Sequence, residues 1–226
     1  MFKFELIFTA ENIGFLLKGA WLSLLIATFS LLVGLLLGTI IAWIRVGKGF
    51  LLKAIMTIYV EVFRGTPMLL QIAIFYLALP YLYQKISGAY LPVNPLIMGI
   101  IAIGLNSSAY LSEVIRASIN SIDKGQWEAG KSLGLPNKKL MMKIILPQAY
   151  KRVIPPLVNE FITLIKDSSL VSTIGVVELM KSAGVLTNKY YDYFTPLICA
   201  AIIYLFMTLI ISFVANRWER KLNIND

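Results

Sequence analysis

Histidine is absent from the 226-residue sequence, and cysteine occurs only once, as Cys199 within an apolar run. A single cysteine excludes an intramolecular disulfide, and without histidine no Cys/His metal site can be assembled. Charged residues are also scarce, since they make up 15% of the chain, where soluble domains contain about 25%. The sequence therefore predicts no disulfide framework and no metal site, and its low charge is not that of a soluble domain.

Apolar residues, in contrast, make up 58% of the chain. A helix needs about 20 consecutive apolar residues to cross a bilayer, and the stretch WLSLLIATFSLLVGLLLGTIIAW meets that requirement without a charge. This first stretch runs far past the apolar part of a cleavable signal peptide, so we expect it to be retained. We predict an all-α integral membrane protein, a single transmembrane domain over residues 1–226, with five transmembrane helices at about 14–44, 54–80, 95–117, 153–180 and 196–216.

Two glycines in the first predicted helix, Gly34 and Gly38, form a small-xxx-small pair. This spacing favours close packing against another membrane helix. Glycine is also common in membrane helices in general. A helix-packing seam is therefore one interpretation of the pair, and ordinary composition is the other.

Lysine and arginine are concentrated in particular loops, which predicts how the chain is oriented in the membrane. Eight of the 21 basic residues lie between residues 116 and 152. Because short cytoplasmic loops are enriched in lysine and arginine, we place the loop 118–152 in the cytoplasm, the N-terminus outside and the C-terminus inside. This distribution accounts for the net charge of +9 without a nucleic-acid partner. The other basic residues assigned to the cytoplasm are Arg45, Lys48, Lys53, Arg217, Arg220 and Lys221, and those assigned to the outside are Lys3, Lys18, Lys85, Lys181 and Lys189.

The cytoplasmic loop contains GQWEAGKS, residues 125–132, which satisfies the phosphate-loop pattern G-x-x-x-x-G-K-[ST]. A phosphate loop follows a buried strand and precedes a helix that packs on a sheet. Here the preceding residues, SEVIRASINSID, continue the third predicted helix. A loop of about 35 residues cannot supply the rest of a nucleotide-binding fold. We therefore expect no nucleotide site and no catalytic residue in this chain.

The same loop is better interpreted as two short helices. KGQWEAGKSLG has the pattern of an amphipathic helix that ends at Gly134, and a second helix is predicted to begin at Pro136 and end at Pro147. An exposed Trp127 and Leu133 would suit docking to a partner protein. A helix that lies on anionic lipid headgroups is the alternative. These features alone leave both interpretations open.

Glu128-Ala129-Gly130, Gly134 and Ile144-Ile145-Leu146-Pro147 follow the pattern E-A-A-x-x-x-G-x₉-I-x-L-P, with Gly130 in place of alanine. This pattern resembles the cytoplasmic loop of ABC-importer permeases. The segments RGTPMLLQ, from Arg64, and KDSSL, from Lys166, resemble two segments of the amino-acid branch. The resemblance covers nearly the whole chain.

This resemblance implies the transmembrane subunit of an amino-acid importer in a prokaryotic plasma membrane. It implies that the loop is a coupling helix, which docks onto a separate ATPase subunit that uses ATP and Mg, while this chain holds no cofactor. It further implies an extracellular binding protein that delivers the substrate. Because five spans are few to enclose a path, we expect a second, identical permease subunit. The predicted ATPase-docking residues are Trp127, Glu128, Ala129, Gly130, Leu133 and Gly134.

Several polar residues fall inside the predicted spans, where ionisable groups face a cavity or one another. Gly65-Thr66-Pro67 would break the second span, with Thr66 as N-cap and Pro67 as first residue of the restarted helix. Glu61 and Arg64 are spaced to pair with each other. In the fourth span a polar stripe runs through Asn159 and Lys166 at helical spacing. The predicted substrate-binding residues are Thr66, Gln71, Asn106, Ser107, Glu113, Glu160, Thr163 and Asp167.

These in-span charges also suggest a substrate. Glu61, Glu113, Glu160 and Asp167 outnumber Arg64 and Lys166, which favours a cationic amino acid such as arginine, lysine or histidine, carried by alternating access. Neutralisation of Glu61 and Glu113 within the protein would weaken this argument, and a structural Lys166–Asp167 pair is the alternative for those two residues. The alternative function is an ion-coupled secondary transporter with Glu113 and Glu160 as relay groups, although the internal repeats typical of such folds are not evident.

Overall fold

Every secondary-structure element in the part of the chain that the structure describes is a helix. This computed structural model describes residues 4–47 and 49–221, without the side chains of Phe4, Leu6, Arg220 and Lys221. Lys3 and Lys48, which contribute to the charge argument, lie outside the described residues. The elements are α1 (Phe4–Ile7), α2 (Ala10–Val46), α3 (Phe50–Gly65), α4 (Met68–Ala73), the π-helical turn η1 (Ile74–Ala78), α5 (Leu79–Ser87), α6 (Pro95–Asn120), α7 (Lys124–Ser132), α8 (Asn137–Leu140), the π-helical turn η2 (Met141–Ile145), α9 (Leu146–Asp167), the 3₁₀ helix η3 (Ser168–Ile174), α10 (Leu179–Tyr190) and α11 (Thr195–Lys221).

Four helical segments are long and apolar enough to cross a membrane, and a bent pair of helices adds a fifth. The bent pair joins Asn137–Ile174 to Leu179–Tyr190 at an angle of 50°. The all-helical prediction agrees with the structure, and the structure offers four spans, or five if the bent pair counts as one span, where five were predicted. The second and fourth predicted spans have other boundaries in the structure. The four single segments are Ala10–Val46, Met68–Ser87, Pro95–Asn120 and Thr195–Glu219.

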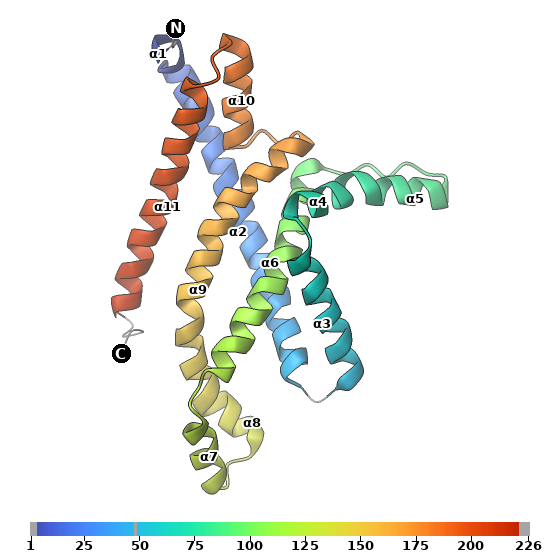
Figure 1. Cartoon of the computed structure of the whole chain (residues 1–226), viewed down its shortest axis with the longest axis vertical. Coiled ribbons are helices and arrows are strands. Elements are labelled where there is room, and N and C mark those ends of the chain that lie inside the picture. Colours follow the sequence, from blue (N-terminus) through green and yellow to red (C-terminus); the bar gives the residue numbers. More distant parts are fainter. Residues whose placement is uncertain (1–3, 48, 222–226) are drawn as a thin grey trace.

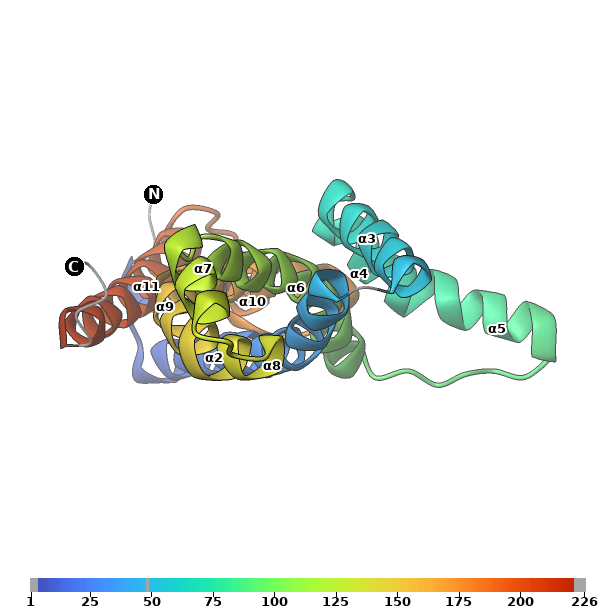
Figure 2. The same cartoon turned by 90° about the horizontal axis from the view of Figure 1, so that it is seen from below.

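The second predicted span, 54–80, is not one helix. α3 ends at Gly65, and α4, η1 and α5 leave in a different direction, toward one edge of the molecule (Figures 1 and 2). Thr66 is extended, with ψ of 146°, because the residue before a proline is disfavoured from helical geometry. The predicted cap was wrong by one residue, since Pro67 is the N-cap of α4 and Thr66 is the C-cap of α3.

The fourth predicted span, 153–180, also differs from the structure. Its α-helix ends at Asp167, tightens into η3, and stops at Gly175, whose φ of 91° is left-handed. The separate helix α10 follows, and it was not predicted. At the other end, Pro147 does not terminate a short helix, because α8 continues through η2 into α9. Pro147 directly follows the π-helical turn η2, where the regular α-helical hydrogen-bond pattern is interrupted.

The centre of the molecule is the contact between α2 and α6. A Cβ atom added at Gly34 would lie 2.7 Å from Ser107 Oγ, and one at Gly38 would lie 2.9 Å from the carbonyl oxygen of Ser108. Both distances are too short for any side chain, so the two helices approach as closely as they do because these residues are glycines. Of the two interpretations of the pair, the packing seam is confirmed.

The last helix lies at the opposite edge from α5 (Figure 2). α11 contacts α9 and α10, but most of its outward side chains are exposed, including Phe206, Phe213 and Trp218. A long apolar helix with so little protein cover is suited to contact with lipid tails. α11 therefore forms part of the outer boundary of the bundle.

Candidate functional site

The break between α3 and α4 is held by a small hydrogen-bond network. Gln71 Nε2 donates to the carbonyl oxygen of Phe63 at 2.8 Å and to Thr66 Oγ1 at 2.8 Å. Asn106 Nδ2, on α6, donates to the same Phe63 carbonyl at 2.9 Å and to Gln71 Oε1 at 3.0 Å. The helix break leaves the Phe63 carbonyl without an intrahelical partner, and these two amides satisfy it.

This network brings together three of the predicted site residues, Thr66, Gln71 and Asn106. Gln71 and Asn106 are only 5% and 7% exposed, so their amide groups are largely committed to one another. Their position fixes α4 against α6 at the point where the chain changes direction. The network therefore shapes the wall of the bundle at the break.

A second polar contact joins α6 to α9. Ser107 Oγ donates to Glu160 Oε1 at 2.7 Å. Thr163 and Asp167 follow Glu160 at three and seven residues, so all three lie on one face of α9. Thr163 is exposed and donates to the carbonyl of Asn159 in its own helix at 3.0 Å. The predicted polar stripe is present, and it ends at the last residue of α9.

Among the described residues, no basic side chain forms a salt bridge with either carboxylate of this stripe. Within the described residues, Glu160 and Asp167 form no salt bridge, and the Lys166–Asp167 ion pair weighed as an alternative is not formed. Glu61 and Arg64 form no salt bridge among the described residues either. The Arg64 guanidinium instead lies over the ring of Tyr110, 5.4 Å from its centroid. Two acidic groups on α9 are therefore open to a cationic partner.

Glu113 lies elsewhere, in an ion cluster near the ends of α2 and α6. Its carboxylate pairs with Arg45, and it accepts from Arg116 Nη2 at 2.6 Å. The Arg45 side chain is only 9% exposed, because α2 extends to Val46 instead of ending in a loop. Glu113 is thus balanced inside the protein, and the structure does not bring it together with Glu160.

Glu178 is a buried acidic residue that the sequence reasoning missed. Glu178 is 0% exposed and caps α10 by accepting from the backbone N–H groups of Met180 and Lys181, each at 2.8 Å. Its carboxylate also accepts from Ser23 Oγ of α2 at 3.2 Å and from the Tyr204 hydroxyl of α11 at 2.8 Å. A glutamate that follows a glycine-ended segment and opens a new helix was the available signal, but the predicted span through residue 180 concealed it.

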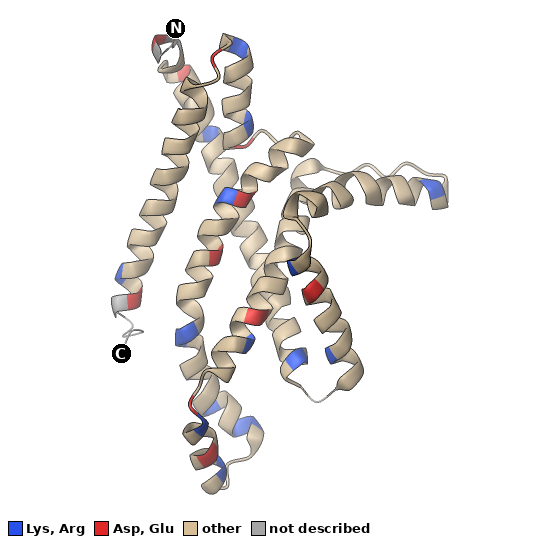
Figure 3. Cartoon of the chain, viewed as in Figure 1, with Lys and Arg blue, Asp and Glu red and all other residues tan. Residues whose placement is uncertain are grey.

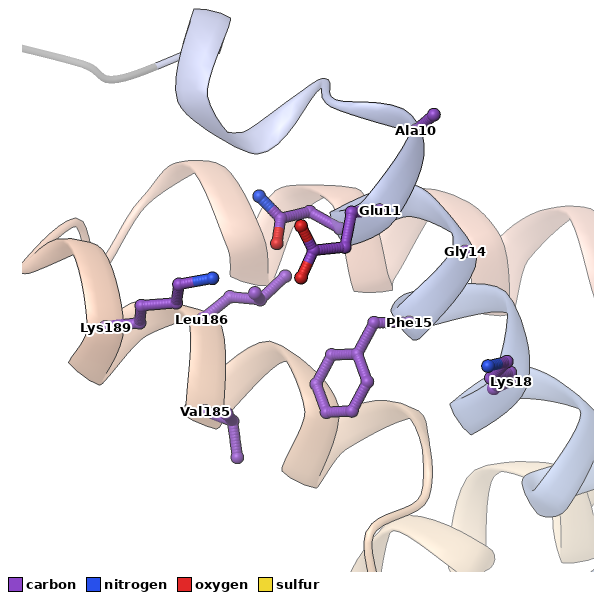
Figure 4. A pocket seen from close by; sticks show the side chains of 9 residues that line it. Ala10, Glu11, Gly14, Phe15, Lys18, Val185, Leu186 and Lys189 are labelled. Atoms are coloured by element: carbon purple, nitrogen blue, oxygen red, sulfur yellow. The ribbon is translucent and has the colours of Figure 1, made fainter.

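A cavity of about 540 Å³ lies between the start of α2 and the end of α10. Figure 4 shows the side chains of Glu11 and Lys189 entering it from opposite walls, with Phe15 and Leu186 beneath. None of the predicted site residues lines this cavity. Its mixed charge suits polar contacts at this end of the bundle.

At the far end of the molecule, α7 and α8 extend beyond the long helices (Figure 1). α7 ends as predicted at Gly134, whose φ is 71°, because its N–H bonds to the carbonyl of Lys131 while the N–H of Leu135 bonds to that of Gly130. The sequence GQWEAGKS, residues 125–132, therefore lies in a capped helix that follows α6. In the described part of the chain no strand precedes it, so the phosphate-loop interpretation stays excluded.

The predicted docking residues separate into inner and outer positions on α7. Trp127 was expected to be exposed, but it is half-buried against the cluster that contains Ile119 and Leu140, because this is the one large apolar group on the inner face of α7. Gly130 is buried against Leu140, and a Cβ atom at this position would require the Leu140 side chain to move. The outward positions are Glu128, Ala129, Leu133 and Gly134, with Leu133 79% exposed.

Comparison with known proteins shows the family to which this architecture belongs. Residues 34–224 match the family described as binding-protein-dependent transport system inner membrane component. The chain is 40% identical over 218 residues to the arginine transport system permease protein ArtQ of Bacillus subtilis, which covers 96% of the chain and 97% of ArtQ. It is 34% identical over 209 residues to the glutamine transport system permease protein GlnP of Escherichia coli, covering 92% and 93%.

A solved structure is also similar. The crystal structure of an amino acid ABC transporter with histidines contains a chain that superposes with a TM-score of 0.86 at 35% sequence identity. The superposition covers 93% of this chain and 95% of the other. Similarity of sequence and of fold thus extends over the same region.

Proposed function

The chain belongs to the family of binding-protein-dependent transport system inner membrane components, and we propose that its cargo is a cationic amino acid. It is a permease subunit of an ABC importer for amino acids, a multi-pass protein of a prokaryotic inner membrane. Membership of this family implies an ATPase subunit and a substrate-binding protein as partners. The cargo, the orientation and the mode of coupling are parts of the proposal.

The proposal of a cationic cargo is based on a difference in salt bridging among the carboxylates inside the spans. Glu113 is balanced by Arg45 and Arg116, whereas Glu160 and Asp167 have no salt bridge within the described residues. A carboxylate at membrane depth that no salt bridge balances is costly, so a site with two such carboxylates favours a ligand that brings positive charge. One relative is named for arginine and one solved neighbour is named as an amino acid ABC transporter with histidines, which supports this assignment. Several other relatives are named for glutamine and one for cystine.

Replacing Glu160 with glutamine tests the cargo. We expect Glu160→Gln to weaken arginine binding by roughly 10- to 100-fold, because a hydrogen bond to a charged group contributes about 1.5–3 kcal/mol. Ser107 keeps an acceptor in the glutamine side chain, so the fold is expected to be retained. The measurement is titration calorimetry with arginine, glutamine and glutamate on the purified permease–ATPase complex, without the binding protein.

Glu61→Gln is the matched control, since Glu61 is an exposed carboxylate of α3 and is expected to leave arginine affinity unchanged. The proposal requires that glutamine affinity change little in Glu160→Gln. If the unaltered complex bound glutamate as tightly as arginine, the cationic cargo would be wrong, although the chain would remain an amino-acid permease.

For the arrangement in the membrane we propose that the N-terminus is outside and that α7 and α8 are cytoplasmic, within one domain over residues 1–226. Two identical permease subunits would form the path, and alternating access would follow closure of the ATPase subunits on ATP and Mg. This chain would hold no cofactor. Basic residues at the α7 end of the bundle support this orientation (Figure 3). An ion-coupled secondary transporter is disfavoured because the family relies on a binding protein.

We propose that α7 is the coupling helix and that its outward residues contact the ATPase subunit. Leu133→Asp is expected to weaken binding of the ATPase subunit roughly 10- to 100-fold, because burying a leucine contributes about 1.5–3 kcal/mol. Leu133 is 79% exposed, so the substitution disturbs no internal packing. Binding is measured by interferometry with the solubilised permease and the separately purified ATPase subunit.

The control for this experiment is Met142→Asp, a matched exchange of an exposed apolar residue on η2. It is expected to retain the ATPase subunit. Equal affinity of Leu133→Asp and the unaltered chain would show that α7 does not form the contact, whatever the cargo.

A further inference from the structure

A basic cavity of about 290 Å³ lies where α2 and α6 end and α3 begins. Its charged walls are Arg45, Lys53 and Arg116, and Asn120 adds an amide. Figure 3 shows that lysine and arginine gather at this end of the long helices. None of its lining residues belongs to α9 or α7.

Internal charges neutralise this cavity only in part. Glu113 accepts from both arginines, and within the described residues Lys53 forms no salt bridge. Each guanidinium has five donors, and Glu113 takes one from Arg45 and two from Arg116. The carboxylate thus holds the two planar groups in place while the remaining donors and Lys53 leave an excess of positive charge. Such an arrangement is suited to a phosphate oxygen.

Exposed apolar side chains lie close in the sequence to the lining residues Arg45 and Lys53, although they do not themselves line the cavity. Phe50, Leu51 and Leu52, which directly precede Lys53, are 87%, 70% and 57% exposed, and Trp43 on α2 is 54% exposed. Large apolar groups beside a basic pocket match an amphiphile, whose tails lie on the apolar side and whose charged head lies in the pocket. Aromatic residues such as Trp43 are typical of the headgroup level of a membrane.

From these three features we propose that the cavity binds the phosphate of an anionic phospholipid. α2 and α6 are both spanning segments that end here, so the cavity lies at the level of the headgroups. In the proposed orientation this is the cytoplasmic leaflet, where basic pockets between helices bind anionic headgroups. Lys53 and the two arginines contact the phosphate, and the first turn of α3 contacts an acyl chain. The phospholipid is a structural partner, separate from the cargo and from the ATPase subunit.

The test is lipid retention by the full-length permease. The protein is purified from equimolar phosphatidylglycerol and phosphatidylcholine with the same acyl chains, and bound lipids are counted by native mass spectrometry. We expect phosphatidylglycerol to be retained preferentially. In Lys53→Gln that preference falls about fivefold, since one basic residue near an anionic surface contributes about 1 kcal/mol. The Lys53 side chain is exposed, so the variant is expected to fold, which its thermal unfolding curve checks.

Lys151→Gln is the matched control, because it removes the same charge from an exposed position on α9 outside the cavity. It is expected to keep the preference for phosphatidylglycerol. Equal losses in both variants, no loss in either, or no preference in the unaltered protein would each overturn the proposal. Displacement of the phospholipid by an equal concentration of inorganic phosphate would assign the cavity to a soluble anion and would overturn the lipid.

Discussion

Glu178→Ala is expected to lower the Tm of the permease by about 10 °C and to abolish uptake. The carboxylate of Glu178 accepts four hydrogen bonds that converge from three helices, and the residue is 0% exposed. Removing it leaves the first N–H groups of α10 and the hydroxyls of Ser23 and Tyr204 without their acceptor. An unsatisfied buried donor costs about 1–3 kcal/mol and a missing N-cap about 0.5–2 kcal/mol, so a total of at least about 3 kcal/mol is expected.

Two further substitutions make this measurement specific. Glu178→Asp keeps a good N-cap for α10 but shortens the stem, so its carboxylate no longer reaches the Tyr204 hydroxyl and we expect an intermediate Tm. Glu61→Ala removes an exposed carboxylate and is expected to unfold like the unaltered protein. Should Glu178→Ala unfold at the unaltered temperature, the buried carboxylate would have no structural role.

Glu113→Leu is expected to destabilise the protein by about 3 kcal/mol or more, because removing one partner of a buried ion pair leaves an uncompensated charge. That charge is Arg45, whose side chain is 9% exposed, whereas Arg116 at 38% can still reach water. The expected readout is a decrease of folded protein in a thermal unfolding assay in detergent. Yields of the expressed protein are expected to fall in parallel.

The double variant Arg45→Met with Glu113→Leu separates the charge effect from an effect on packing. Replacing both partners with apolar groups of similar size is often neutral, so most of the stability is expected to return. A double variant as unstable as Glu113→Leu alone would mean that the ion pair itself is not what Glu113 contributes. Arg45→Met alone is expected to be mild, since Arg116 still pairs with Glu113.

The spans with continuous apolar sequence could be predicted well. The first and last predicted helices, 14–44 and 196–216, correspond to α2 and α11 with only a few residues added at their ends. Membrane burial imposes a long apolar run, and such a run has few alternatives to an α-helix. Helix existence therefore followed from hydropathy alone.

Breaks in the helices were harder to predict. Proline at position 67 indicated where α3 must stop, but the direction of α4 depends on the bonds between Gln71 and Asn106, which join segments 35 residues apart. After Asp167 the segment SSLVSTI mixes hydroxyl and apolar residues, and this pattern does not distinguish an α-helix from a 3₁₀ helix. α10 escaped notice because its sequence, LMKSAGVLTNKY, mixes polar and apolar residues.

In the candidate site, too, features set within one helix could be predicted, whereas contacts between helices could not. Spacing within one helix correctly aligned Glu160, Thr163 and Asp167 on a face of α9. Partners on other helices, in contrast, carry no local signal: Arg45 and Glu113 are 68 residues apart, and Ser23 and Glu178 are 155 apart. An acidic residue inside a span could be recognised as functional or structural only once its partner was known.

The unbroken length of α2 has a mechanical consequence. At 37 residues without a proline it is a stiff rod roughly 55 Å long. Ser23 attaches one part of it to the α10 joint, Arg45 anchors its other end, and the glycines that touch α6 lie between them. If α2 tilts about its contact with α6, its two ends move in opposite directions. We therefore expect the Ser23–Glu178 and Arg45–Glu113 contacts to be strained alternately and not to loosen at the same time.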